Sequence, residues 1–149
     1  MDRIKDICHD VGYLLGKGYS ETVYQEGIAV LLRELCIKYS KEVNLQVKIN
    51  NVVVGVVRAD IVLPDEEIII ECKAIDSDLK ISCLPQLVNY LKITHIPNGM
   101  FVNFNQNPLR NMVEIITLQQ CEHDSTLYQV QREGKDDLFI DDNGMLKDI

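Results

Sequence analysis

The feature that most constrains the fold is a series of three β-type segments between residues 43 and 75. They read VNLQVKI, VVVGVVRADIVL and IIIECKAI, and each combines β-branched residues with alternating or continuous apolar positions. Turn signals separate them, because Asn50-Asn51 follows the first segment and Pro64–Glu67 follows the second. The pattern predicts a three-strand antiparallel meander.

Helical periodicity is found on both sides of this meander. Ser20 is a suitable N-cap for one of the helices, and Pro85 falls in the first turn of another, where proline is tolerated. The further elements predicted are helices over 2–15, from Ser20 to near Cys36 and over 84–94, and strands over 99–104 and 112–118. We therefore expect an α/β domain of the α+β type.

The length and the cysteines indicate one intracellular domain. The chain has 149 residues, and its 46% hydrophobic content is enough for a single core. Its five cysteines are scattered and include no C-x-x-C pair, which is typical of reduced thiols. The first ten residues mix charged and apolar positions, unlike a signal peptide or a membrane span. We expect a soluble protein with no membrane partner.

The charge is acidic and uneven. The net charge is −8, whereas general nucleic-acid binders are usually basic. Eight acidic and three basic residues lie from position 120 onward (net −5), which leaves −3 for the rest. We expect residues 1–119 to form the domain and residues 120–149 to be an acidic C-terminal extension that is partly ordered on it. The acidic balance argues against tight binding of DNA without excluding an enzyme that acts on it.

The turn between the second and third segments brings two acids together. If its loop has four residues, Leu63 pairs with Ile68, and antiparallel counting then sets Asp60 opposite Glu71. Lys73 is two residues beyond Glu71, so strand alternation puts it on the same face. Like charges directly opposite each other are destabilising unless a cation lies between them. A functional site is the simplest reason for this arrangement.

The alternative is a solvated sheet face, on which Lys73 forms an ordinary surface ion pair worth about 0–1 kcal/mol. Taken alone, the D…E-x-K spacing favours that alternative, because short motifs are unspecific. The surroundings argue against it. Glu71 follows Ile68–Ile70 and precedes Cys72, so it interrupts an apolar run that is typical of a central strand. An acid at such a position is rarely without a role.

Several ordered motifs resemble those of the GxxExxY group of the PD-(D/E)xK nuclease superfamily. They are Gly18, Glu21 and Tyr24 in GKGYSETVY, Arg58 and Asp60 before a hydrophobic strand, Glu71, Lys73 and Ala74 as E-x-K-A, Q-L-x-x-Y-L-K from Gln86 to Lys92, and the apolar strand with N-F over Gly99 to Phe104. The resemblance covers about residues 10–105. It implies a restriction-endonuclease-like core, with a central mixed sheet flanked by helices, and metal-dependent hydrolysis of phosphodiester bonds in DNA.

The resemblance also implies roles for residues of the site. Asp60, Glu71 and the backbone carbonyl of Cys72 would hold Mg²⁺, for which Mn²⁺ could substitute, since all three supply hard oxygen ligands. Lys73 would position or deprotonate the attacking water and stabilise developing negative charge. Glu21 would complete the catalytic site, as a ligand or through water. Its alternative role is that of an acid favoured by the helix dipole.

Three more residues are candidates on the same grounds. Gln86 would face the metal site from the third helix and is counted with the catalytic residues, its alternative being an exposed helical glutamine. Tyr24 would contact substrate or a carboxylate, although a core tyrosine fits its position about as well. Arg58 would contact phosphate, although a strand arginine paired with an acid is the commoner case.

Two functions are therefore compatible with the sequence. The first is a nuclease whose expected partner is nucleic acid, namely DNA, although the residues alone do not distinguish DNA from RNA. The second is a non-catalytic protein of the same fold that serves as a structural or interaction component of a larger assembly and meets a basic protein with its acidic surface. A homodimer or a protein assembly is a further expected partner. Fold alone does not choose between the two functions. The Asp60, Glu71 and Lys73 set favours the enzyme, and the net charge favours the second function.

Overall fold

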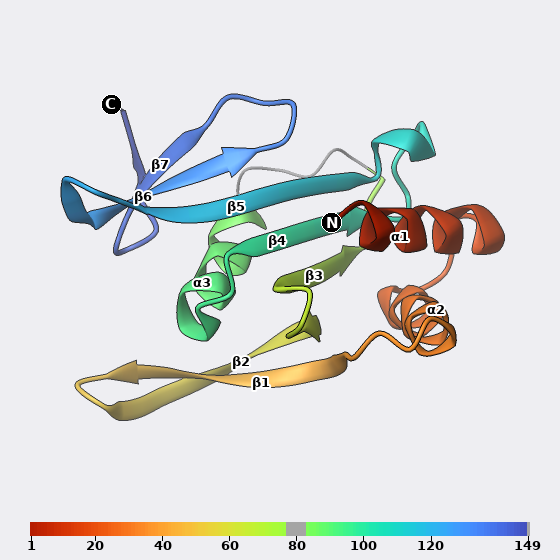
Figure 1. Cartoon of the computed structure of the whole chain (residues 1–149), viewed down its shortest axis with the longest axis horizontal. Helices are drawn as coiled ribbons and strands as arrows, with labels where there is room; N and C mark the ends of the chain where they lie inside the picture. Colours follow the sequence, from red (N-terminus) through yellow and green to blue (C-terminus); the bar gives the residue numbers. More distant parts are fainter. Residues whose placement is uncertain (77–82, 149) are drawn as a thin grey trace.

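The structure, a computed structural model, describes residues 1–76 and 83–148 as an eight-stranded sheet with helices on both faces (Figure 1). The helices in these residues are α1 (Asp2–Leu15), α2 (Glu21–Glu34), α3 (Leu84–Thr94) and the short 3-10 helix η2 (Leu109–Asn111). The strands are β1 (Ser40–Ile49), β2 (Val52–Leu63), β3 (Ile68–Lys73), β4 (Asn98–Asn103), β5 (Val113–Cys121), β6 (Asp124–Arg132), β7 (Leu138–Asp141) and β8 (Leu146–Lys147).

The strands follow one another across the sheet in chain order. β3 and β4 are parallel, and all other neighbouring pairs are antiparallel. A parallel pair needs a crossover connection, and α3 lies in the connection between β3 and β4. The fold is therefore the expected α+β type, a mixed sheet that contains an antiparallel meander, and it is consistent with a restriction-endonuclease-like core.

The meander has the register predicted from its turn. Leu63 pairs with Ile68 and Ile61 pairs with Ile70, as a four-residue loop between β2 and β3 requires. The first turn, at Asn50 and Asn51, has φ values of 49° and 64°. Both values lie in the left-handed region that asparagine tolerates better than most residues, which explains why this pair ends β1.

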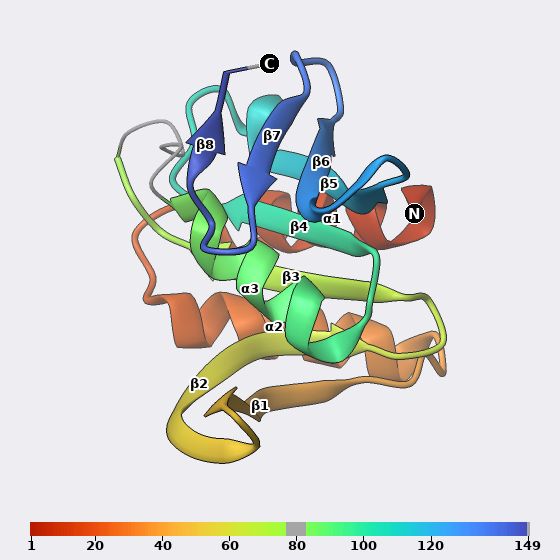
Figure 2. The same ribbon diagram turned by 90° about the vertical axis from the view of Figure 1, so that its left-hand side faces the viewer.

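The helices cover opposite faces of the sheet. α1 and α2 lie behind it and α3 lies in front of it in Figure 2. Each face has its own buried cluster: α1 and α2 pack on Ile61, Leu63, Ile68, Ile70 and Met100, and α3 packs on Ala59, Ile69, Phe101 and Ile116. Burying one such aliphatic side chain stabilises the fold by about 1.5–3 kcal/mol.

β3 is buried on both faces, which accounts for its continuous apolar sequence. Ile68 and Ile70 belong to the cluster under α1 and α2, whereas Ile69 belongs to the cluster under α3. All residues from Ile68 to Cys72 are buried, Glu71 included. The acid of the E-x-K block is therefore inside the protein.

Gly99 permits the close approach of α3 to the sheet. A Cβ atom at this position would lie 2.7 Å from Cδ2 of Leu87 on α3 and 3.1 Å from Cγ1 of Ile116 on β5. Only a residue without a side chain leaves this contact unstrained. Gly99 thus sets the distance between α3 and the strands that carry the site.

The acidic C-terminal region continues the sheet. β5 passes through the expected boundary at residues 119/120, and β6, β7 and β8 extend the edge beyond it. Val130 on β6 and Ile140 on β7 are buried in the cluster under α3. The sequence pattern is weak here because each of these two strands has one fully buried residue in an otherwise more exposed segment. The division at residue 120 stays a prediction.

None of the helices in the described ranges is long and apolar enough to span a membrane.

Candidate active site

The backbone ladder between β2 and β3 gives way to side-chain hydrogen bonds at the two acids. The last paired residues before them are Ile61 and Ile70. Beyond this point the N–H of Asp60 donates to Oε1 of Glu71 at 3.1 Å, and the N–H of Cys72 donates to Oδ2 of Asp60 at 2.8 Å. The structure therefore brings Asp60 and Glu71 together, and each carboxylate accepts a main-chain N–H from the opposite strand.

β2 is irregular where Asp60 leaves the ladder. Ala59 packs under α3, whereas Ile61 packs under α1 and α2, although regular alternation would put both on one face. Glu42, which lies on β1 between the partners of these two residues, has a φ of 53°. This local distortion lets the Asp60 carboxylate turn toward β3.

Both acids are held in an environment that opposes their ionisation. Glu71 is 2% exposed. Burial raises the pKa of Glu71 to about 8, and the neighbouring Asp60 charge adds to the shift. Burial also raises the pKa of Asp60, although the Cys72 N–H and the positive charge of Lys73 oppose this shift. A buried and a half-buried carboxyl group in contact are a site at which a bound proton or cation is favoured.

A third oxygen lies on the same side of β3. In an antiparallel pair, the N–H and C=O of one residue point toward the same neighbouring strand. Because the N–H of Cys72 points to Asp60, the Cys72 carbonyl lies on that side as well. Two carboxylates and one carbonyl are a set of hard oxygen donors that fits Mg²⁺ or Mn²⁺.

Side-chain hydrogen bonds join α3 to Lys73 on β3. The Lys73 ammonium donates to Oε1 of Gln86 at 3.4 Å, and Nε2 of Gln86 donates to the hydroxyl of Tyr90 at 2.9 Å. Burial raises the pKa of Tyr90, and the negative charge of Glu71 adds to the shift. Lys73, Gln86 and Tyr90 thus form a row of hydrogen bonds, and the positive charge of Lys73 opposes the rise in the pKa of both acids.

Sequence reasoning did not single out Tyr90. A signal for it existed, because Gln86 and Tyr90 are four residues apart and residues at this spacing lie on one face of a helix. Tyr90 is 3% exposed and lies on the buried side of α3. Arg58 is exposed on β2. Its positive charge lowers the pKa of both Asp60 and Tyr90, so Arg58 borders the same site.

Glu21 lies on a different element from the two acids. It is exposed in the first turn of α2, which covers the face of the sheet opposite α3. Burial raises the pKa of the Cys72 thiol, and the negative charges of Asp60 and Glu21 add to the shift. In residues 1–76 and 83–148, no group of three or more His, Cys, Asp and Glu side chains is placed to hold a metal ion.

Tyr24 is part of the core. It is fully buried, and its ring stacks on Phe104 at 4.2 Å between centroids with an interplanar angle of 2°. Its hydroxyl donates to the carbonyl of Gly16 at 2.6 Å. Gly18 has a φ of 104°, which favours glycine, so two residues of the GKGYSETVY motif fix the connection between α1 and α2. The burial of Tyr24 supports its core interpretation.

Comparison with known proteins gives one family. The model described as the PD-(D/E)XK nuclease superfamily matches residues 1–115, which include both acids, Lys73 and all of α3. Neither the curated proteins nor the solved structures give a significant match.

Proposed function

The chain belongs to the PD-(D/E)XK nuclease superfamily, and on this basis we propose that it is a metal-dependent nuclease that hydrolyses phosphodiester bonds of DNA. The observation that carries the proposal is the mutual arrangement of Asp60 and Glu71 beside Lys73. A purely structural protein gains little from a buried and a half-buried acid in contact, because the Asp60 charge opposes the ionisation of Glu71. The narrower GxxExxY assignment rests on the motif alone.

Asp60, Glu71 and the carbonyl of Cys72 would hold the ion, either Mg²⁺ or Mn²⁺. Their fit is supported by the hard oxygen donors and by the raised pKa values of the two acids, which a cation would lower. When bound, the ion would supply polarisation of the scissile phosphate and an activated water. We propose Glu21 as a more distant acid that acts through water, since it belongs to no metal-binding group among the described residues.

Lys73 supplies the positive charge of the site. We propose that its ammonium positions the attacking water and stabilises the negative charge that develops on the phosphate. Gln86 accepts a hydrogen bond from this ammonium and would hold it in place, and Tyr90 anchors Gln86 in turn. Arg58, at the exposed border of the site, would contact a phosphate group of the substrate.

The test is a comparison of wild type with Lys73→Met. The two proteins are incubated with single-stranded, duplex and branched DNA, with and without Mg²⁺ or Mn²⁺, and DNA binding is measured in parallel. Lys73→Met keeps most of the stem and removes the charge, so we expect cleavage to be lost while metal-dependent DNA binding remains. Lys38→Met is the matched control, because Lys38 is exposed between α2 and β1.

Full cleavage by Lys73→Met would contradict the role of Lys73. Absence of cleavage by wild type with either metal would favour the second function, a structural or interaction component. In that case the substitution should change the free energy of unfolding by no more than about 0.5 kcal/mol.

A further inference from the structure

A groove lies between the β1–β2 hairpin and α3, beside the candidate active site. It encloses about 560 Å³. Gln86 and Tyr90, which connect to Lys73, belong to its lining. The groove is therefore continuous with the site, although none of the roles assigned above requires it.

The hairpin forms one wall through Gln46, Val47, Lys48 and Val57. This wall belongs to a segment of net positive charge in an acidic protein. Residues 43–59 contain Lys48 and Arg58 and no acidic residue, so they carry +2 in a chain whose net charge is −8. The rest of the chain therefore carries −10. An anionic ligand that approaches this wall meets less repulsion than it would at the acidic parts of the surface.

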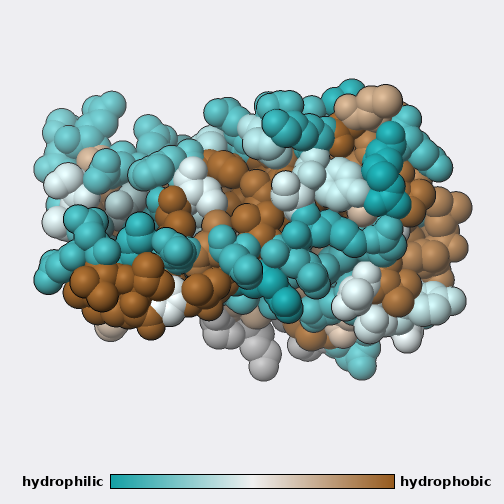
Figure 3. Space-filling model, turned by 90° about the horizontal axis from the view of Figure 1, so that it is seen from below, coloured by the Kyte–Doolittle hydropathy of each residue, from teal (hydrophilic) through white to brown (hydrophobic). Residues whose placement is uncertain are grey.

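The wall continues into an exposed apolar tip. Figure 3, seen from below, shows a hydrophobic patch at the end of the molecule where the hairpin projects. The large exposed side chains of this segment are Ile49, Val52, Val53, Val54 and Val56. Such a surface can lie against nucleobases and places no negative charge near their phosphates.

α3 forms the other wall, with Asn89 and Ile93 beside Gln86 and Tyr90. An amide side chain can both donate and accept hydrogen bonds, and Asn89 on α3 and Gln46 on the hairpin both supply one to the lining of the groove. Ile93 and Val57 add aliphatic surface, and Tyr90 adds an aromatic side chain. Amides, aliphatic surface and a cation together suit a ligand that alternates bases with phosphates.

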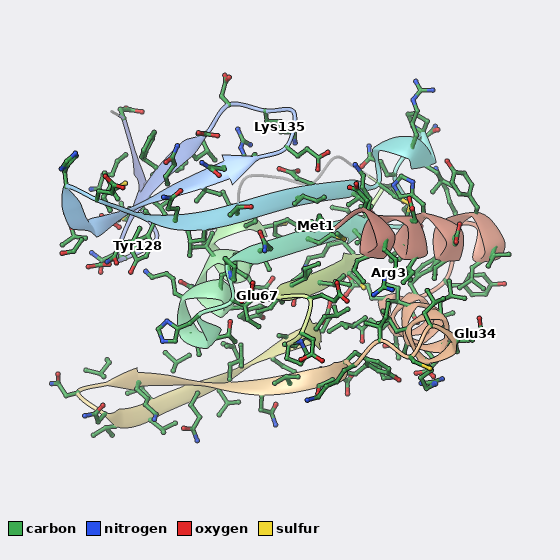
Figure 4. All side chains as sticks on the ribbon, in the orientation of Figure 1. Met1, Arg3, Glu34, Glu67, Tyr128 and Lys135 are labelled. Carbon is green, nitrogen blue, oxygen red and sulfur yellow. The ribbon has the colours of Figure 1, made fainter. Side chains whose placement is uncertain are left out.

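The far end of the groove is fixed by the C-terminal region. The Lys92 ammonium donates to the backbone carbonyl of Asp142 at 2.8 Å and lies 4.6 Å from the ring centroid of Tyr128, which Figure 4 labels on β6. Lys92 is therefore engaged with the tail, and Asp142 brings one negative charge to this end. The contact with a phosphate would consequently fall to Lys48, on the opposite wall.

We propose that this groove binds a single strand of nucleic acid and leads it to Asp60, Glu71 and Lys73. The proposal rests on the nuclease function and deepens it by naming the form of the substrate. A space of this size is in the range of sites for small-molecule ligands, about 300–1,000 Å³, and holds nucleotide units. On the basis of this volume we take one strand, and not a double helix, as the occupant of the groove.

The test measures binding without cleavage. Fluorescence anisotropy of the full chain in EDTA is followed with a labelled oligothymidylate and with a blunt duplex of the same length, over a series of salt concentrations. Lys48→Gln removes the cation of the hairpin wall, and Asn89→Glu puts a negative charge on the α3 wall. Both residues are exposed, and circular dichroism checks that each variant folds. Lys17→Gln, an exposed lysine in the α1–α2 connection, is the control.

We expect wild type to bind the single strand more tightly than the duplex. Lys48→Gln should weaken binding of the single strand about 3- to 10-fold and reduce its salt slope by about 0.7, the value for one lost phosphate contact. Asn89→Glu should weaken it at least as much, and Lys17→Gln should leave it unchanged.

Several outcomes would contradict the proposal that the groove binds a single strand. These are absence of binding by wild type, tighter binding of the duplex, or single-strand binding that neither groove substitution changes. The outcomes separate this proposal from the nuclease function. If wild type cleaves DNA and the groove variants bind and cleave as wild type does, only the proposed role of the groove is contradicted. If wild type never cleaves DNA but binds single strands through Lys48, binding by the groove is supported and the nuclease function is contradicted.

Discussion

The carboxylate of Glu71 accepts the backbone N–H of Asp60 at 3.1 Å, so the main chain that carries one acid holds the side chain of the other. The Asp60 carboxylate is held in the same manner by the N–H of Cys72 at 2.8 Å. The positions of both acids therefore follow from the pairing of β2 with β3 and not from free side-chain rotation. A site fixed in this way is organised before any ligand arrives.

Asp60→Asn should stabilise the metal-free protein. Asparagine keeps an oxygen that can accept the Cys72 N–H, and it removes the charge that opposes Glu71. We expect the free energy of unfolding at pH 8 to rise by about 0.5–1 kcal/mol, as measured by urea denaturation in EDTA. Asp60→Ala is the matched comparison. It relieves the same repulsion but leaves the N–H without its acceptor, so it should be less stable than Asp60→Asn. A large loss of stability in Asp60→Asn would mark the charge as structural.

The stability of the metal-free protein should fall as the pH rises from about 4.5 to about 8. An ordinary glutamate ionises near 4.5, whereas burial raises the pKa of Glu71 in the folded protein to about 8. The stability that the neutral carboxyl contributes is thus complete below pH 4.5 and is lost as the pH approaches 8. The loss should be on the order of a few kcal/mol. Thermal denaturation in EDTA across this range measures it.

Glu71→Gln is the control for this pH dependence, because glutamine cannot ionise. Its stability should change less with pH over the same range. Adding Mg²⁺ should stabilise wild type more at pH 8 than at pH 6, since the ion binds ionised carboxylates. If the stability of Glu71→Gln depended on pH in the same way as that of wild type, groups other than Glu71 would cause the pH dependence.

Tyr90→Phe should lower kcat with little effect on KM. The change removes the hydroxyl that accepts the Gln86 amide, and through Gln86 it loosens the hold on Lys73. We expect about a tenfold loss of kcat, with a change in stability of about 1 kcal/mol. Gln86→Ala should have a similar effect, and the double variant should lose less than the two single effects together. Tyr39→Phe is the control, because that hydroxyl bonds Arg33 away from the site. If the losses of kcat in the two single variants added up in the double variant, Tyr90 and Gln86 would not act through the same contact with Lys73.

Gly99→Ala should destabilise the fold by about 1–3 kcal/mol. The added methyl would meet Leu87 on α3 at 2.7 Å and Ile116 on β5 at 3.1 Å, so the helix must shift away from the sheet. Gly55→Ala on the exposed hairpin is the matched control, because its Cβ would meet no atom within 4 Å. Urea denaturation of both variants measures the difference. Equal stability would show that α3 tolerates displacement.

The register that carries the acids could be predicted from the sequence, because local chemistry sets it. The loop Pro64–Glu67 fixes the pairing of Leu63 with Ile68, and the apolar run around Glu71 marks β3 as central. The bounds of α3 were predicted for the same reason, since its apolar spacing and Pro85 are local signals. These features need no knowledge of distant parts of the chain.

Contacts between elements far apart in the chain could not be predicted in this way. Tyr90 meets Gln86 on one helix, but its closeness to Glu71 depends on how α3 crosses the sheet. Glu21 was expected beside the acids, a role that stays a prediction, and the structure places α2 on the other face. β6 and β7 were missed because one buried residue in each, Val130 and Ile140, gives no periodic pattern.

The burial of β3 on both faces has a consequence for how the site can lose its structure. Its main chain lies between two separate cores, and the Cys72 N–H bonded to Asp60 is enclosed with it. Local openings that release loops or the hairpin tip leave this segment closed. Exchange of the Cys72 amide with solvent should then be slow, and Asp60 and Glu71 keep their mutual position for as long as β2 and β3 stay paired.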